Sequence, residues 1–182
     1  GRRLGRERLV LVSACAVLAV EFLHGRRVVH RDVKPENLLI DATTGLAKLA
    51  DFGMSRLLEA GERATSASGT PATMAPEVAY GLGHGLECDW WSLGATVWEL
   101  MCGEPPFRKA PHECAKAGEA WPESRVPGDA PEGAAPSGGA ELCRGLLAAS
   151  PSARAGAQEC RQSAFFASLD WGALEAGQVR GE

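Results

Sequence analysis

The sequence lacks an excess of positive charge. Its 182 residues contain 19 Lys and Arg against 23 Asp and Glu, for a formal net charge of −4 at pH 7. Nucleic-acid-binding domains present basic surfaces, so no nucleic-acid partner is expected. Hydrophobic residues make up 45% of the chain, which excludes wholesale disorder and is typical of one globular domain with its own core.

Paired cysteines are also missing. None of the six cysteines stands in a C-x-x-C arrangement, the spacing typical of zinc sites and redox motifs. Isolated cysteines are most often small buried hydrophobic residues of a reducing compartment. A zinc site using His112 and Cys114 is the alternative, and it is disfavoured because the sequence offers no second ligand pair.

No hydrophobic run is long enough to span a bilayer. The longest, residues 9–22, is shorter than the roughly 20 residues that a bilayer core requires, and Arg26 and Arg27 follow it. A helix buried on nearly all sides explains the run better. A signal peptide is the weaker alternative, because a motif rich in catalytic residue types begins soon afterwards at His30. We expect no membrane span and, without a visible targeting signal, a cytoplasmic location.

Hydrophobic periodicity predicts a mainly helical chain. Apolar residues on an Ala-rich background predict a helix at residues 7–24, with Gly25 as its end. A strongly apolar helix is expected at 89–101, and another begins at Leu142. Residues 165–171 contain two Phe and one Trp, which predicts a last helix that packs on the core.

The predicted strands are few and short. Residues 28–29 favour a strand, and residues 38–40 and 46–49 favour a β-hairpin. Residues 54–74 are rich in Ser, Thr, Ala and Gly and predict a mobile loop. Residues 122–140 are rich in Pro, Gly and Ala and predict a low-complexity, irregular loop.

Three short motifs occur in one order in the first half of the chain. Residues 30–39 read HRDVKPENLL, residues 51–53 read DFG and residues 75–77 read APE. They resemble the catalytic loop, the magnesium loop and the end of the activation segment of eukaryotic protein kinases. The resemblance implies the large, mainly α C-terminal lobe of the protein-kinase fold, with a small β-hairpin region and with the N-terminal lobe absent.

The residue types in these motifs suit phosphoryl transfer, which depends on positioning and charge neutralisation. The resemblance implies that Asp32 accepts the proton of the substrate hydroxyl and that Lys34 contacts the γ-phosphate of ATP. It also implies that Asn37 and Asp51 bind Mg²⁺, a cation that prefers oxygen ligands. Glu36, in the same loop, is part of the expected ATP-binding set. Without the other motifs, Asp51 would be interpreted as an ordinary loop or helix-cap residue.

The same region indicates which hydroxyl is phosphorylated. A lysine two positions after Asp32, together with Thr70 in the sequence Gly-Thr-Pro, resembles serine/threonine kinases and not tyrosine kinases. The resemblance implies a catalytic role for Thr70, which would bond to Asp32 and Lys34. By itself the tripeptide indicates only a turn. The expected partners are proteins that carry Ser or Thr.

Three further segments resemble the AGC group, the cyclic-nucleotide-dependent kinases and their relatives. They are DWWSLG at 89–94, GEPPF at 103–107 and FFASLDW at 165–171. Calcium/calmodulin-dependent kinases share the catalytic loop but match these segments less well. We expect a partial kinase domain over residues 1–175 and a tail over 176–182.

The resemblance also implies structural and substrate-binding roles. Asp89 anchors the catalytic loop, and Glu77 pairs with Arg154 to hold the activation segment against the later helices. Glu36 and Glu99 match positions that hold a basic residue just before the phosphorylated Ser or Thr. Substrates with upstream Arg or Lys are therefore expected, although each carboxylate alone is simply a solvated charge or a helix-end charge.

Regulation is expected at the activation segment. Ser66 falls where the AGC group places its activating phosphate, and Arg31 would pair with that phosphate through charge-assisted hydrogen bonds. Thr65 is adjacent and is the second candidate. The alternative, that both are solvated loop residues, remains open.

The sequence before the catalytic loop lacks several features of the kinase pattern. There is no glycine-rich loop, no strand lysine with its partner glutamate and no hinge for adenine. We expect a fragment of a longer kinase that requires an N-terminal lobe or a regulatory subunit, since the catalytic residue types are all kept. The alternative is a naturally truncated, inert kinase-like lobe that acts as a protein-interaction module.

Overall fold

The structure is a computed structural model that describes residues 4–121 and 137–179. Its helices are α1 Arg6–His24, α2 Pro76–Ala79, α3 Glu87–Cys102, α4 Pro111–Lys116, α5 Gly139–Leu146, α6 Ala157–Gln162 and α7 Trp171–Glu175. Its strands are β1 Val28–Val29, β2 Leu38–Ile40, β3 Ala47–Leu49 and β4 Arg56–Leu57. The predicted class, mainly helical with a small amount of β-structure, is confirmed for these residues.

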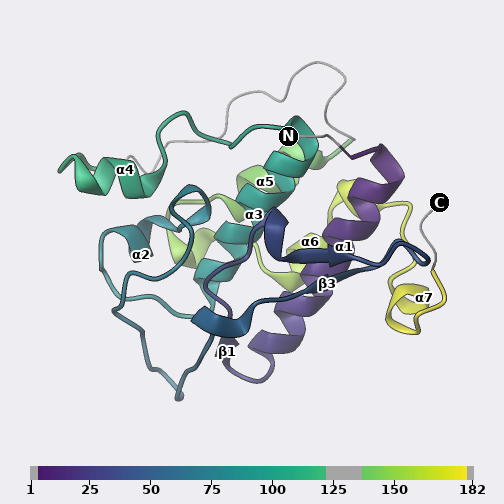
Figure 1. The fold of residues 1–182 in the computed structure, drawn as a ribbon, viewed down its shortest axis with the longest axis horizontal. Helices are drawn as coiled ribbons and strands as arrows, with labels where there is room; N and C mark the ends of the chain where they lie inside the picture. The colour runs from purple at the N-terminus through teal and green to yellow at the C-terminus, as the bar shows by residue number, and fades with distance from the viewer. Residues whose placement is uncertain (1–3, 122–136, 180–182) are drawn as a thin grey trace.

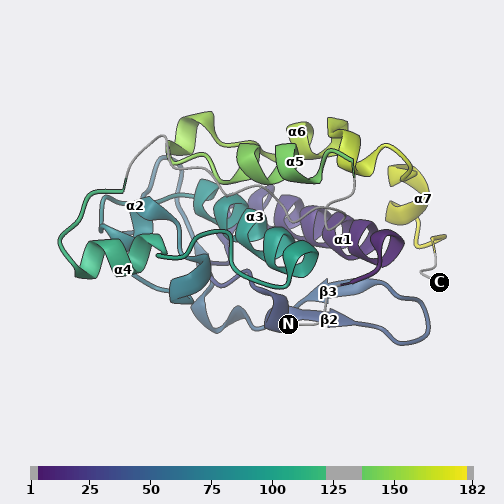
Figure 2. The same ribbon diagram turned by 90° about the horizontal axis from the view of Figure 1, so that it is seen from above.

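The centre of the molecule is a pair of long helices, α1 and α3, which pack against each other (Figure 1). Seen from above, α5 and α6 cover one side of this pair and the β2–β3 hairpin lies on the other (Figure 2). The layers follow from burial, because an apolar helix must cover its surface with other elements.

Helix α1 has almost no exposed face over its first half. Every residue from 9 to 17 is buried, because α3 packs on one side and strand β3 on another. The predicted helix at 7–24 is confirmed within one residue, and it stops at Gly25 as expected. Among the described residues, no helix is long and apolar enough to cross a membrane.

Helix α3 approaches α5 so closely that only a glycine fits between them. A Cβ atom on Gly94 would lie 2.7 Å from Leu146 Cβ and 3.0 Å from Leu147 Cγ. The predicted helix at 89–101 is confirmed and is slightly longer at both ends, with Gly103 ending it at φ 81°.

Helix α5 begins earlier than predicted. It starts at Gly139 and not at Leu142, so the predicted irregular loop at 122–140 is wrong at its last two residues. A Cβ on Gly139 would lie 2.9 Å from Met101 Sδ. Only tertiary packing distinguishes this helical glycine from a loop glycine. Residues 122–136 of the predicted loop lie outside the described residues.

Two antiparallel pairs of strands frame the motifs. In the predicted hairpin, β2 pairs with β3, and Leu38 lies opposite Leu49. The predicted strand β1 also exists, but its partner is β4, with Val29 opposite Arg56. The predicted loop at 54–74 is therefore wrong at β4, and also at Ala64, which forms a bridge with His84. Strands this short carry no periodic pattern, so only their distant partners define them.

The C-terminal aromatic segment packs on the core, but not as one helix. Phe165 and Phe166 are buried in a single 3-10 turn, and α7 then starts afresh at Trp171. Asp170 caps α7 by accepting a hydrogen bond from the Ala173 amide at 2.9 Å. The predicted last helix therefore exists, but it begins only at Trp171, because this cap interrupts the apolar run.

Candidate active site

The predicted catalytic loop, residues 30–39, is attached to helix α3 through Asp89. This carboxylate is fully buried and accepts hydrogen bonds from the His30 and Arg31 amides, both at 2.8 Å. A third contact, at 2.9 Å, comes from His24 Nε2 at the end of α1. Arg31 adopts φ 68°, a left-handed conformation that turns two successive amides towards one carboxylate. A buried carboxylate with three donors gives the loop a single position.

Asp32 is the most heavily bonded side chain of this loop. Thr70 donates to Oδ1 through its hydroxyl at 2.6 Å and its amide at 3.0 Å. Lys34 Nζ lies 2.7 Å from Oδ2, and Asn37 Nδ2 donates to the same oxygen at 3.1 Å. Asp32 is 6% exposed, so these bonds lie in a largely buried environment.

These contacts shift the pKa values of Asp32 and Lys34. Burial raises the pKa of Asp32, but hydrogen bonds from Lys34 and Thr70 outweigh burial and bring the pKa below its ordinary value. The hydrogen bond to Asp32 raises the pKa of Lys34. At neutral pH the structure therefore places a carboxylate beside an ammonium, in a geometry that can orient a hydroxyl group.

Asn37 and Asp51, the two predicted Mg²⁺ ligands, carry side-chain oxygens in neighbouring loops. The Asn37 carbonyl accepts from the Ala50 amide at 2.9 Å, which places the two loops side by side. Asn37 Nδ2 is used on the carbonyl and carboxylate of Asp32, which leaves its amide oxygen for a ligand. Asp51 is exposed and left-handed at φ 62°, and its Oδ1 accepts from the Gly53 amide at 3.2 Å.

This donor set fits Mg²⁺ and does not fit zinc. Two protein oxygens suit a cation that retains water and takes further oxygens from phosphates. Within the described residues, no group of three or more His, Cys, Asp or Glu side chains is placed to hold a metal ion. The six cysteines are buried thiols.

His30 links the two loops, although its role was not predicted. Its Nε2 donates to the Ala50 carbonyl at 3.1 Å, and its Nδ1 accepts from the Asp32 amide at 3.3 Å. The ring also meets Phe52 edge to face, with centroids 5.1 Å apart. The signal for His30 was its place in the motif, whereas no local signal identifies His24.

The predicted activation segment, which ends at residues 75–77, meets the predicted catalytic loop at Arg31. Its Nη1 donates to Ser66 Oγ at 2.9 Å, and its Nε donates to the Met54 carbonyl at 2.5 Å. Ser66 and Thr65 are both exposed. Gly69 is required here, because it adopts φ 120° and a Cβ would lie 2.3 Å from the Arg31 carbonyl oxygen.

Glu36 and Glu99 come from different elements and lie near one another. Burial raises the pKa of Glu99, and the charge of Glu36 raises it further. No ion pair involves either carboxylate within residues 4–121 and 137–179. The pair can therefore receive a cationic group from a bound molecule.

Glu77 and Arg154 form a bidentate ion pair in the interior. Nη1 lies 2.7 Å from Oε1 and Nη2 lies 3.0 Å from Oε2. The Arg154 side chain is fully buried and also donates to the carbonyls of Glu87, Ala148 and Ala149. The pair joins α2, at the end of the activation segment, to the chain that precedes α6.

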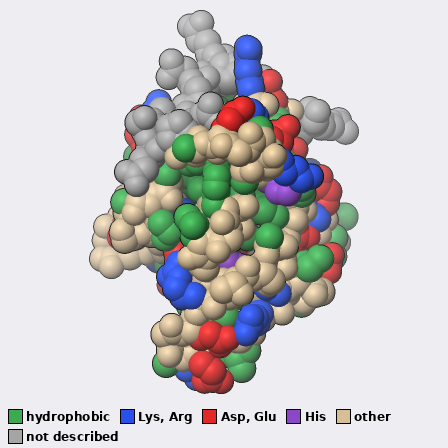
Figure 3. Space-filling model, turned by 90° about the vertical axis from the view of Figure 1, so that its left-hand side faces the viewer, with side chains coloured by type: hydrophobic (Ala, Val, Ile, Leu, Met, Phe, Trp, Pro, Cys, Tyr) green, Lys and Arg blue, Asp and Glu red, His purple; other side chains and the backbone are tan. Residues whose placement is uncertain are grey.

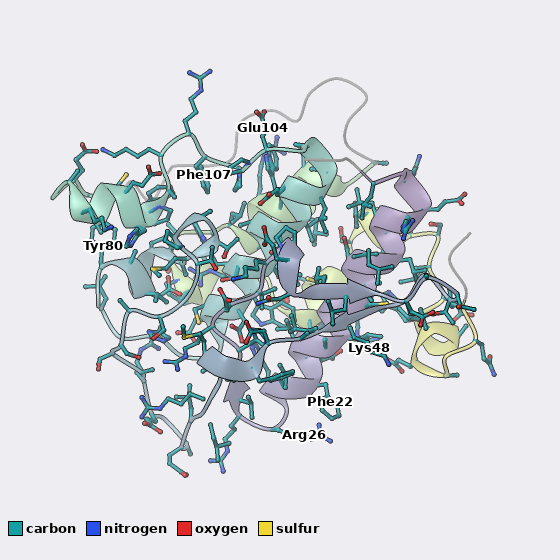
Figure 4. The ribbon with its side chains drawn as sticks, in the orientation of Figure 1. Phe22, Arg26, Lys48, Tyr80, Glu104 and Phe107 are labelled. Atoms are coloured by element: carbon teal, nitrogen blue, oxygen red, sulfur yellow. The ribbon has the colours of Figure 1, made fainter. Side chains whose placement is uncertain are left out.

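A separate hollow lies on the face that carries α2 and α4, where hydrophobic side chains gather (Figure 3). A cavity of about 330 Å³ there is lined by Tyr80, Leu82 and Trp121, among others, and by none of the predicted ATP-binding residues. Tyr80 lies between α2 and α4, and Phe107 lies on the segment that enters α4 (Figure 4). Phe107 stacks on Trp91 with ring centroids 5.8 Å apart, which ties this region to α3.

Comparison with known proteins identifies the family. The protein kinase domain family matches residues 3–166, and the chain therefore belongs to the protein kinase family. The prediction of this family, with relatives in the AGC group, is confirmed.

Three relatives illustrate the extent of the similarity. The chain is 37% identical over 182 residues to the serine/threonine-protein kinase AtPK1/AtPK6 of Arabidopsis thaliana, covering 97% of this chain and 38% of that protein. It is 48% identical over 95 residues to the cAMP-dependent protein kinase catalytic subunit of Dictyostelium discoideum, covering 52% of this chain and 14% of that protein. It is 45% identical over 95 residues to the cGMP-dependent protein kinase, isozyme 2, of Drosophila melanogaster, covering 52% of this chain and 10% of that protein. The chain thus spans 10% to 38% of the length of these relatives.

Proposed function

We propose that this chain supplies the large, C-terminal lobe of an AGC-like serine/threonine protein kinase and carries its catalytic groups. The reaction is ATP-dependent phosphorylation of Ser and Thr hydroxyls in proteins. The kinase domain is assigned to residues 1–175 and the tail to 176–182. The observation that carries the proposal is the Asp32 carboxylate, which is ionised and held from two sides by Lys34, Thr70 and Asn37.

The bonding of Asp32 suggests how the site becomes active. A carboxylate offers about four lone-pair positions, and all four are used here, two by Thr70 and one each by Lys34 and Asn37. A substrate hydroxyl can bind Asp32 only if one donor leaves. Lys34 is the donor with another destination, because its flexible stem can carry the ammonium to a phosphate. Asp32 then orients the hydroxyl and takes its proton.

The ATP side of the site is assigned to Lys34, Glu36, Asn37 and Asp51. Mg²⁺, held by the Asn37 amide oxygen and the Asp51 carboxylate, would neutralise charge on the phosphates. The low pKa of Asp32 keeps it ionised at neutral pH, which leaves it ready to accept a hydrogen bond from the hydroxyl.

The peptide side of the site is assigned to Glu36 and Glu99. Two neighbouring carboxylates without an ion-pair partner among the described residues favour Arg or Lys in the substrate. A regulatory subunit as partner and a cytoplasmic location remain predictions.

Transfer of labelled γ-phosphate from Mg²⁺–ATP to a basic Ser-containing peptide tests the proposal. Wild-type chain is compared with Asp32→Asn, which removes the ionised carboxylate but keeps the shape. Transfer by the wild type that the variant loses supports a catalytic lobe. Equal incorporation in both would reject Asp32 as the catalytic base.

A protein-interaction module is the second candidate, because several large apolar side chains are exposed. Leu39, Phe52 and Leu57 are 60%, 51% and 59% exposed, and they lie on β2, beside the Asp51 loop and on β4. Surfaces of this kind often bind other proteins. This candidate predicts partner binding that Asp32→Asn leaves intact, and no phosphoryl transfer.

A further inference from the structure

Two buried hydroxyl groups lie one turn apart on helix α3, and the proposed reaction uses neither of them. Ser92 is 5% exposed and Thr96 is fully buried. Each hydroxyl lies within hydrogen-bond distance of two carbonyl groups, one on its own helix and one on another segment. A hydroxyl has only one proton to donate, so the shorter contact indicates which carbonyl receives it.

Ser92 directs its proton to the other segment. Its Oγ lies 2.8 Å from the Thr73 carbonyl oxygen and 3.3 Å from that of Cys88, one turn earlier in α3. Thr96 has the opposite preference, with 2.8 Å to the Ser92 carbonyl oxygen and 3.2 Å to that of Val33. A hydroxyl inside a helix often bonds back to the carbonyl four residues earlier, as that of Thr96 does. The shorter bond of Ser92 is instead a tertiary contact.

The acceptor of this bond ends a short turn in the predicted activation segment. Thr73 is the last residue of a single 3-10 turn, Pro71–Thr73. Thr73 is 4% exposed, and a carbonyl at the end of a helical turn has no partner within the turn, so it needs one elsewhere in the protein. Ser92 provides that partner. The Thr73 amide donates to the Thr70 carbonyl at 3.1 Å, which closes the turn and connects its two ends.

Thr70, which precedes the turn, holds the proposed catalytic carboxylate. Its amide and its hydroxyl both donate to Asp32 Oδ1, at 3.0 and 2.6 Å. Two bonds from one residue to one oxygen define the position of that oxygen closely. In the proposed reaction Lys34 leaves Asp32 for a phosphate. The bonds from Thr70 and Asn37 then determine how the carboxylate faces the substrate hydroxyl.

We propose that Ser92 is a positioning residue, whose hydroxyl holds the 71–73 turn so that Thr70 fixes the orientation of the Asp32 carboxylate. The inference rests on the proposed function, because that function assigns Asp32 as the group that accepts the substrate proton. Among the described residues, no hydrogen bond joins Ser92 to the residues assigned to ATP or to the peptide. Ser92 therefore affects the geometry of Asp32 and not the binding of either substrate.

Amide hydrogen exchange tests this role without ATP. The exchange of the 182-residue chain is followed residue by residue by nuclear magnetic resonance. In Ser92→Ala we expect the Thr70 and Thr73 amides to exchange about tenfold faster, because the turn opens more often without its buried hydrogen bond. The His30 amide, which Asp89 holds at 2.8 Å, lies in the catalytic loop and should keep its wild-type rate. Equal acceleration of all three amides, or of none, would overturn the proposal, since a general loss of stability acts on every amide.

Ser13→Ala is the matched control. Ser13 is fully buried in α1, and its hydroxyl has no hydrogen-bond partner among the described residues. The control variant thus loses the same atom from a buried helix without losing a contact to the turn. We expect the wild-type exchange rates at Thr70 and Thr73. Accelerated exchange there would show that any buried serine has this effect and would reject a specific role for Ser92.

Ser92→Cys is a second variant that keeps the site filled, and it gives the comparison if Ser92→Ala does not fold. A thiol is a weaker donor than a hydroxyl, so exchange at Thr70 and Thr73 should be faster than in the wild type and slower than in Ser92→Ala. Wild-type rates in Ser92→Cys would mean that the strength of the donor does not matter, which contradicts the proposal.

Kinetics of phosphoryl transfer provide the readout at the reaction itself. Ser92→Ala should lower kcat about tenfold and leave KM for ATP and for the peptide little changed, because a misplaced carboxylate affects the transition state more than binding. A higher KM at an unchanged kcat would reject the positioning role. An inactive wild-type chain would reject the proposed function, whereas the exchange rates would still show whether Ser92 holds the turn. The two failures are therefore distinguishable.

Discussion

Lys34 Nζ lies 2.7 Å from Asp32 Oδ2, and the same ammonium donates to Thr70 Oγ1 at 2.9 Å. The lysine therefore connects the proposed catalytic carboxylate to the activation segment. This arrangement makes the stability of the chain sensitive to pH at both ends of the scale.

Replacing the pair with Asp32→Asn and Lys34→Met should flatten the pH dependence of the free energy of unfolding. The pKa of Asp32 is lowered in the folded chain, so its stabilisation is present above the unfolded value of about 3.9 and is lost as the pH falls through the folded pKa. The pKa of Lys34 is raised, so its stabilisation is present below about 10.4 and is lost as the pH rises through the folded pKa. Urea unfolding at pH 3, 7 and 11 measures both limbs. A double variant with the wild-type pH profile would contradict the assignment.

Removing one partner of the Glu77–Arg154 pair should destabilise the chain strongly. Glu77→Gln leaves a guanidinium that is fully buried and without its carboxylate, at a cost of about 3–5 kcal/mol. Glu59→Gln is the matched control, because its contact with Arg27 is 3.8 Å long and exposed, and such pairs contribute less than about 1 kcal/mol. Denaturant unfolding gives both values. Similar losses in the two variants would show that burial does not set the strength of the Glu77 pair.

The contact between α3 and α5 should not tolerate a methyl group. Gly94→Ala places a Cβ 2.7 Å from Leu146 Cβ, and overpacking of this kind costs about 1–3 kcal/mol. That cost exceeds the gain in helix propensity of about 1 kcal/mol.

Gly25→Ala is the control for this variant. Its φ is −60° and its nearest neighbour would be 3.5 Å away, so we expect little change or slight stabilisation. Thermal unfolding of the two variants decides the matter. Gly94→Ala unfolding at or above the wild-type temperature would mean that the helices separate easily.

Glu99→Gln should weaken the proposed preference for basic peptides. The variant removes one of two neighbouring carboxylates, so we expect KM for an Arg-containing peptide to rise about tenfold, equivalent to 1.4 kcal/mol, with kcat little changed. A peptide without upstream basic residues should show no change. If both peptides were affected equally, Glu99 would be structural and not a specificity residue.

The preference should also fade with falling pH. Burial and the charge of Glu36 raise the pKa of Glu99, so this carboxyl becomes neutral at a higher pH than an ordinary glutamate, whose pKa is about 4.3. The ratio of KM values for neutral and basic peptides, measured from pH 7 down to 5, should fall in the wild type and stay flat in Glu99→Gln.

The elements predicted correctly are those whose pattern is local. Helix α1 and the β2–β3 hairpin agree with the predicted ranges within one residue, because apolar spacing and a turn sequence lie within a single segment. The motif at 30–39 likewise placed Asp32, Lys34 and Asn37 in one loop, where Lys34 and Asn37 both bond to the Asp32 carboxylate.

The elements that were missed depend on distant partners. Strand β4 and the Ala64–His84 bridge are too short to show periodicity, and only their pairing defines them. The His24 contact with Asp89 joins residues 65 positions apart, so no local pattern announces it.

By itself, the sequence determined the helical class, the hairpin and the types of chemical group in the site, because these follow from neighbouring residues. Only the tertiary structure decided how those groups are held. The Asp89 anchor, the two hydrogen bonds from Thr70 to Asp32 and the Glu77–Arg154 pair arise from segments that meet after folding. Packing selects such contacts, and packing depends on the whole core.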